Sequence, residues 1–171
     1  MRVQGSTFAA AVAVFLVLVL TDGAGRAQGL RNLLLPRRGT GEVDLRGSYQ
    51  RQPEDVLLVF LSYGPFLDKG RLQAGFSADY RQAGGSDITT LGAFVNYHFP
   101  GRSPVLPFVG AFYGVSNRDG DSVTLRGVQA GAKYFVNRRV AASATLVYRD
   151  YDLEAARDQV FLLFGLAAYF R

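Results

Sequence analysis

The chain has 171 residues, a formal net charge of +5, 49% hydrophobic residues and no cysteine. The lack of cysteine excludes a disulfide framework and a thiolate metal or catalytic site. The positive charge is too mild to indicate nucleic-acid binding. The 20 glycines and the 13% aromatic content are typical of a β-sheet protein with many tight turns.

Residues 1–27 have the layout of a secretory signal peptide: a basic start, a short apolar run from Phe8 to Leu20, and small residues at the cleavage site before Gln28. An uncleaved membrane anchor is the alternative, but the run is shorter than the roughly 18 to 20 residues of a spanning helix. We expect an exported protein with a periplasmic lead-in segment, 28–41, followed by one folded domain, 42–171.

Eight segments of the domain have the composition or the alternation of β-strands, separated by turn-like sequences. The expected strands are 42–50, 56–64, 71–81, 88–99, 106–116, the two arms of a hairpin spanning 123–151, and 159–170. Segment 56–64 is apolar on both its odd and its even positions, so its facing cannot be read from the sequence. This spacing of strands and turns indicates an antiparallel barrel or sandwich.

The hairpin from Val123 to Tyr151 shows the pattern most clearly. Its even positions are mostly apolar in both arms and its odd positions are mostly small or polar, so both arms present apolar side chains to the same side of the sheet. A soluble barrel would turn this face inward, whereas a membrane barrel turns it toward lipid.

Three observations favour the membrane barrel over a soluble exported ligand-binding barrel. The strands are about ten residues long, as a tilted bilayer crossing requires. The apolar face carries aromatic residues typical of an interfacial girdle: Tyr49, Tyr80, Tyr97, Tyr134, Tyr148 and Phe170. The polar face carries both charge signs, which a narrow lumen can pair: Asp44, Arg46, Asp79, Arg81, Lys133 and Arg149.

The sequence therefore predicts an all-β fold, a closed antiparallel eight-stranded up-and-down transmembrane β-barrel. The charged residues of the polar face are expected to form a lumen ion-pair network. Within it, the expected partners of Lys133 and Arg149 are Asp44 and Asp79.

Three stretches, LPFVGAFYGV, GVQAGAKYFVNRRVAASATLVYRDYD and FGLAAYF, resemble the small eight-stranded outer-membrane barrels of Gram-negative bacteria. These are the outer membrane protein A, X and W and opacity-type group, and the resemblance covers essentially the whole mature chain. It implies a signal read by the barrel-assembly machinery at Leu163, Gly165, Ala168 and Phe170. Members usually end on the aromatic residue, whereas Arg171 follows Phe170 here.

The resemblance also implies an outer-membrane location, both chain ends in the periplasm, and a monomer in contact with outer-membrane lipid and lipopolysaccharide. With this topology the periplasmic turns are basic, with Asp68 as the lone acid: Lys69, Arg71, Arg102, Arg138, Arg139 and Arg171. The outer loops are acidic: Glu54, Asp55, Asp87, Asp119, Asp121, Asp152, Glu154 and Asp158. We hypothesise that the basic rim contacts anionic phospholipids and the acidic rim meets lipopolysaccharide through divalent cations. Turns charged only for solvation are the alternative.

No catalytic, cofactor or metal site is expected. His98 is the only histidine, and its turn has no carboxylate that could orient it in a catalytic triad. We therefore expect it to be a girdle or lumen-rim residue. The run Asn117 to Asp121 lacks the full ligand spacing of a calcium loop and favours a hairpin turn. The expected role is structural or surface-interacting, without enzymatic activity. The alternative is a narrow channel for small hydrophobic or ionic solutes, if the glycine-rich polar face leaves room.

Overall fold

The computed structural model describes residues 36–51, 55–83, 85–99, 104–118, 121–152 and 159–171. The expected signal peptide and most of the lead-in segment lie outside these residues. In the part of the chain that the structure describes, no helix is long and apolar enough to cross a membrane.

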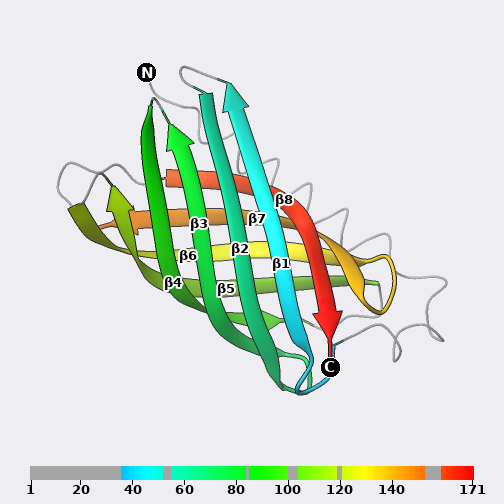
Figure 1. The fold of residues 1–171 in the computed structure, drawn as a ribbon. Coiled ribbons are helices and arrows are strands. Elements are labelled where there is room, and N and C mark those ends of the chain that lie inside the picture. The colour runs from blue at the N-terminus through cyan, green and yellow to red at the C-terminus, as the bar shows by residue number, and fades with distance from the viewer. Residues whose placement is uncertain (1–35, 52–54, 84, 100–103, 119–120, 153–158) are drawn as a thin grey trace, which may run out of the picture.

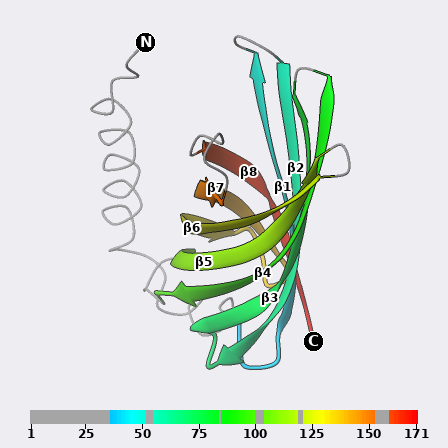
Figure 2. The same cartoon turned by 90° about the vertical axis from the view of Figure 1, so that its left-hand side faces the viewer.

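Eight antiparallel strands form one closed barrel, and each strand pairs with the next along the chain (Figure 1). The strands are β1 (Gly41–Arg51), β2 (Asp55–Asp68), β3 (Leu72–Ala83), β4 (Ser86–His98), β5 (Val105–Arg118), β6 (Asp121–Phe135), β7 (Val140–Tyr151) and β8 (Gln159–Phe170). The predicted fold class is confirmed. The strands cross the barrel obliquely, so front and back walls run in different directions (Figure 2).

Strand β1 pairs with β8 to close the barrel, and this ladder is short. It runs from Gly41 opposite Phe170 to Gly47 opposite Phe164. By contrast, β5 and β6 pair along almost their whole length, from Val105 to Arg118. Beyond Gly47, β1 is therefore paired through β2 alone, and the first part of β8 through β7 alone.

The structure settles the facing of β2, whose sequence is apolar on both sides. Leu58 and Phe60 point inward and are buried, whereas Leu57, Val59 and Leu61 are exposed on the outside. Strand β2 is also longer than expected. Phe66, which the sequence placed in a turn, belongs to the strand and is completely buried inside the barrel.

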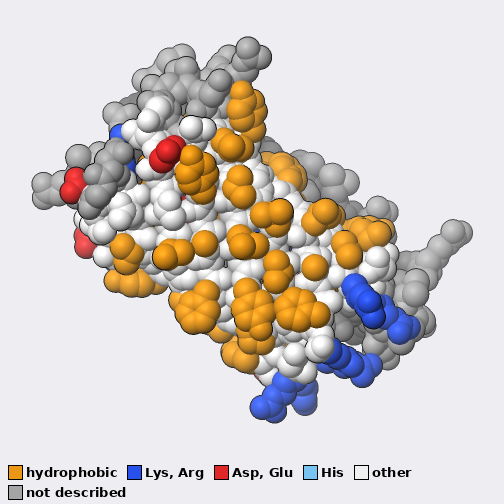
Figure 3. Space-filling model, viewed as in Figure 1, with side chains coloured by type: hydrophobic (Ala, Val, Ile, Leu, Met, Phe, Trp, Pro, Cys, Tyr) orange, Lys and Arg blue, Asp and Glu red, His pale blue; other side chains and the backbone are white. Residues whose placement is uncertain are grey.

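The outer surface is apolar along the middle of the barrel. Phe76 is 72% exposed, Leu91 64% and Leu166 61%, and these residues lie on different strands. Figure 3 shows hydrophobic side chains spread across the wall, with a cluster of Lys and Arg at one end. A soluble monomer rarely exposes so continuous an apolar surface, whereas the hydrocarbon core of a bilayer requires one.

Candidate functional site

The barrel lumen contains the charged residues that the alternation assigned to the polar face. Asp44, Arg46, Asp79, Lys133 and Arg149 are each at most 5% exposed. Their strands place them inside because each occupies the parity opposite to the exposed apolar residues. Arg81 lies nearer the outer end and is only partly buried.

Arg149 and Asp79 form a two-pronged ion pair. The Arg149 Nη1 donates to Asp79 Oδ1 at 2.9 Å and Nη2 donates to Oδ2 at 2.8 Å. Parallel hydrogen bonds of this kind fix the orientation of both groups and are the strongest of the charge-assisted contacts. Arg81 does not join this pair: its Nη1 donates to the Gln159 side chain at 2.6 Å.

Lys133 pairs with a residue that the sequence reasoning missed. Its Nζ lies 2.5 Å from Glu42 Oε1, so its partner is Glu42 and not Asp44. Asp44 instead lies 3.5 Å from Arg46 Nε and accepts a hydrogen bond from Ser143 at 3.1 Å. Glu42 was overlooked because it stands at the start of β1, yet it shares the inward parity of Asp44 and Arg46.

Three amide side chains connect these ion pairs across the lumen. Gln73 donates to Glu42 at 3.1 Å, and Asn96 donates to Gln73 at 3.3 Å. Gln129 then donates to Asn96 at 2.7 Å and accepts from Arg46 at 3.5 Å. These connected residues join strands β1, β3, β4, β6 and β7. We call them the lumen network: Glu42, Asp44, Arg46, Gln73, Asn96, Gln129, Lys133 and Ser143.

Each of the three fully buried cations also lies against an aromatic ring. Arg46 is 4.2 Å from the centre of the Phe60 ring, and Lys133 is 5.0 Å from that of Phe108. Arg149 lies 5.4 Å from the Phe161 ring. A cation over an aromatic face gains electrostatic stabilisation in a desolvated site. These aromatic residues also face the interior, so the inward face of the barrel carries aromatic side chains as well as polar ones.

Apolar layers lie at both ends of the interior. The cluster at the end of the barrel that holds the C-terminus is formed by Phe66, Leu106, Phe135, Ala141, Ala167 and Tyr169. Toward the opposite end, a second cluster is formed by Leu58, Phe60, Val147, Phe161 and Leu163, with Phe112 against it. Polar groups in the middle are therefore separated from water by packed apolar side chains.

The inward glycines accommodate large neighbours and do not leave space. A side chain at Gly131 would collide with the Phe108 ring, and one at Gly127 with the Phe112 ring. At Gly165 a Cβ would collide with the Leu45 backbone oxygen and lie 2.7 Å from the Arg46 side chain. At these positions the glycine-rich face, which the sequence left open as a channel wall, is covered by a side chain of the neighbouring strand.

His98 is completely buried and packs among aromatic rings. Its ring centre is 4.9 Å from that of Phe66 and 5.4 Å from that of Phe108, and neither ring nitrogen has a hydrogen-bond partner among the described residues. This is the environment of a packed core residue.

The described residues hold no cluster of three or more His, Cys, Asp or Glu that could bind a metal. At the outer end, Arg118 pairs with Asp121 in the β5–β6 ladder, as in a hairpin.

The girdle candidates are all on the outer surface. Tyr49, Tyr80, Tyr97, Tyr134, Tyr148 and Phe170 are between 38% and 61% exposed. Tyr80 also donates a hydrogen bond to Asp87 at 2.8 Å. The residues of the expected assembly signal lie on β8, with Leu163 facing inward and Ala168 and Phe170 facing outward.

Comparison with solved structures agrees with this geometry. Neisserial surface protein A aligns with a TM-score of 0.57 and 19% identity, covering 77% of this chain and 94% of its own. The N-terminal β-barrel domain of Pseudomonas aeruginosa OprF aligns with a TM-score of 0.53 and 20% identity, covering 78% and 98%. The fold is that of a small outer-membrane β-barrel.

A de novo designed transmembrane β-barrel aligns with a TM-score of 0.51 and 17% identity over 80% of this chain and all of the design. No family model and no curated protein matches the sequence. The likeness is thus one of fold: at such low identity the strand order and closure are shared while most side chains differ.

Proposed function

We propose that this chain is an outer-membrane protein whose barrel has a structural or surface-interaction role and no enzymatic activity. The observation that carries the proposal is the filled lumen. Its buried acids Glu42, Asp44 and Asp79 balance the buried cations Arg46, Lys133 and Arg149. Glu42, Asp44, Arg46 and Lys133 belong to the lumen network, and Asp79 and Arg149 form a separate ion pair across the barrel. An ion or solute would have to displace this network to cross.

Two features support the location in an outer membrane. The exposed wall is apolar, with aromatic residues among its exposed side chains, as the lipid-facing band of such barrels is. The barrels that it resembles include one described as a surface protein and one designed to be transmembrane. The partners we propose are outer-membrane lipid, lipopolysaccharide at the outer rim, and the barrel-assembly machinery during insertion, with the barrel itself a monomer.

Cell fractionation and gel migration test the location. The protein should sediment with the outer membrane and migrate differently on SDS gels before and after boiling, because a closed barrel resists SDS until heated. Recovery in the periplasm without detergent would instead establish a soluble exported barrel.

Planar-bilayer recording tests the role. The purified folded protein should give no conductance above the bilayer background under conditions in which a general porin conducts. Discrete conductance steps that depend on added protein would overturn the closed-lumen proposal and establish a channel, while leaving the membrane location intact.

A further inference from the structure

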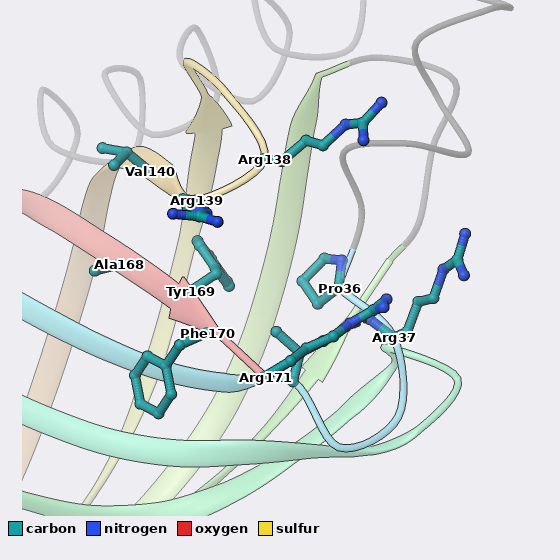
Figure 4. A pocket seen from close by; sticks show the side chains of 10 residues that line it. Pro36, Arg37, Arg138, Arg139, Val140, Ala168, Tyr169, Phe170 and Arg171 are labelled. Carbon is teal, nitrogen blue, oxygen red and sulfur yellow. Dashed lines mark hydrogen bonds between the residues drawn. The ribbon is translucent and has the colours of Figure 1, made fainter.

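A basic pocket opens at the periplasmic end of the barrel, where three segments of the chain meet. Its volume is about 810 Å³, and it is lined by Pro36, Arg37, Thr40, Arg138, Arg139, Val140, Ala168, Tyr169, Phe170 and Arg171. Figure 4 shows its four arginines on three segments: Arg37 before β1, Arg138 and Arg139 in the turn before β7, and Arg171 after β8. No lining residue is acidic.

Backbone hydrogen bonds fix all three segments in place. The turn at Pro36–Thr40 is held to the end of β2 because Gly39 N donates to Phe66 O and Phe66 N to Thr40 O, each at 2.8 Å. The turn before β7 is closed by the Asn137 side chain, which accepts from the backbone N–H of Arg139 at 2.8 Å. Tyr169 N donates to Arg139 O at 2.8 Å, which attaches this turn to the end of β8.

The pocket arginines differ electrostatically from the cations of the lumen. Lys133 and Arg149 each have a carboxylate partner. Among the described residues, no carboxylate lies within ion-pair distance of Arg37, Arg138 or Arg139. Cationic groups converging on one cavity repel one another unless an anion lies between them. All three arginines are exposed to solvent, and an anion bound between them would relieve this repulsion.

The pocket also has an apolar side that adjoins the outer wall. Ala168 and Phe170 belong to the exposed face of β8, and Val140 lies beside them at the start of β7. The Phe170 ring lies against Gly41 and is stacked with Tyr63, with their centres 6.0 Å apart. The basic groups thus stand at the border between the lipid-facing wall and the periplasmic rim.

We propose that this pocket binds the headgroup phosphate of an anionic phospholipid of the periplasmic leaflet. Guanidinium groups match phosphate oxygens with paired hydrogen bonds. The apolar side formed by Val140, Ala168 and Phe170 contacts the first part of an acyl chain. This inference rests on the proposed membrane location, and it sharpens the basic-rim hypothesis from a diffuse attraction to one site.

The test measures lipid binding to the folded barrel in detergent micelles by native mass spectrometry, with phosphatidylglycerol, phosphatidylcholine and inorganic phosphate as probes. The wild type should retain phosphatidylglycerol preferentially. The double variant Arg138→Gln, Arg139→Gln should bind it roughly 20- to 30-fold more weakly, as expected for two basic residues near an anionic headgroup. Lys69→Gln is the matched control, because Lys69 is exposed at the same rim but does not line the pocket.

Three outcomes overturn the proposal: equal retention of the two lipids, equally tight binding of inorganic phosphate, or the same loss in the Lys69 variant as in the double variant. The last would show that net rim charge, and not this pocket, attracts the lipid. Since the barrel is already folded in micelles, these results are independent of where the protein resides in the cell. Failure of the site and failure of the membrane location are therefore distinguishable.

Discussion

Arg149 and Asp79 connect two strands that are not neighbours in the barrel. Strand β7 carries the arginine and β3 the aspartate, and the two hydrogen bonds between them, at 2.9 and 2.8 Å, bridge opposite parts of the wall. Both side chains are at most 3% exposed. The pair therefore ties the interior together in a way that ladder hydrogen bonds between adjacent strands cannot.

Replacing Asp79 with alanine should lower the free energy of unfolding by about 3–5 kcal/mol, because it leaves the Arg149 guanidinium buried without its counter-charge. The readout is urea unfolding in lipid vesicles, supported by the temperature at which the unboiled gel band converts. Asp150→Ala serves as the control, since its pair with Arg126 is exposed and should matter little. Equal effects of the two substitutions would contradict a stabilising lumen pair.

A double-mutant cycle should identify the partner of Lys133. The substitutions Glu42→Gln and Lys133→Met should show a coupling energy of about 1–3 kcal/mol, because their charged atoms are in direct contact. The cycle of Asp44→Asn with Lys133→Met should show a smaller coupling, because Asp44 contacts Arg46 and Ser143. If the Asp44 cycle gave the larger value, the arrangement at the start of β1 described above would be wrong.

Alanine at Gly131 should destabilise the barrel by about 1–3 kcal/mol through overpacking, because its Cβ would collide with the Ala144 backbone oxygen and lie 2.9 Å from atoms of the Phe108 ring. Gly47→Ala should cost less, since the nearest neighbour of its Cβ would be the Leu58 carbonyl oxygen at 3.3 Å. Urea midpoints of both variants in vesicles provide the comparison. A tolerated alanine at Gly131 would show that the lumen has spare room.

Arginine at Leu91 should cost about 2–4 kcal/mol of folding free energy in a bilayer, because Leu91 is 64% exposed in the middle of β4. Val136 is equally exposed but lies in the turn between β6 and β7, at the end of the barrel, where the same substitution should cost about 0–1 kcal/mol. Folding titrations in vesicles measure both. A soluble barrel would show no such difference with depth.

The sequence contains enough information for the strand count and for most facings. Alternation identifies the exposed face of the β6–β7 hairpin, because every second side chain of a strand points the same way. It fails for β2, since Leu58 and Phe60 are apolar side chains that fill the lumen while Leu57 and Val59 are apolar side chains that face outward. Hydrophobicity cannot separate these two environments.

Pairing inside the lumen is less accessible to sequence reasoning. Inward parity predicts that Lys133 and Arg149 meet acids, but the choice among Glu42, Asp44 and Asp79 depends on the stagger of strands around the closed barrel. The pocket arginines were partly foreseen, because Arg138 and Arg139 were assigned to the basic rim. Arg37 was not, because its turn belongs to the segment that the sequence indicated as a lead-in, although hydrogen bonds attach it to β2.

The short ladder between β1 and β8 has a consequence for the order of folding. These strands are the most distant in sequence, so their pairing carries the largest loop-closure entropy while forming the fewest ladder contacts. Hairpins such as β5–β6 can form early and locally. The pairing of β1 with β8 is then the last part of the wall to form, and these two strands are the first to separate when the barrel is heated.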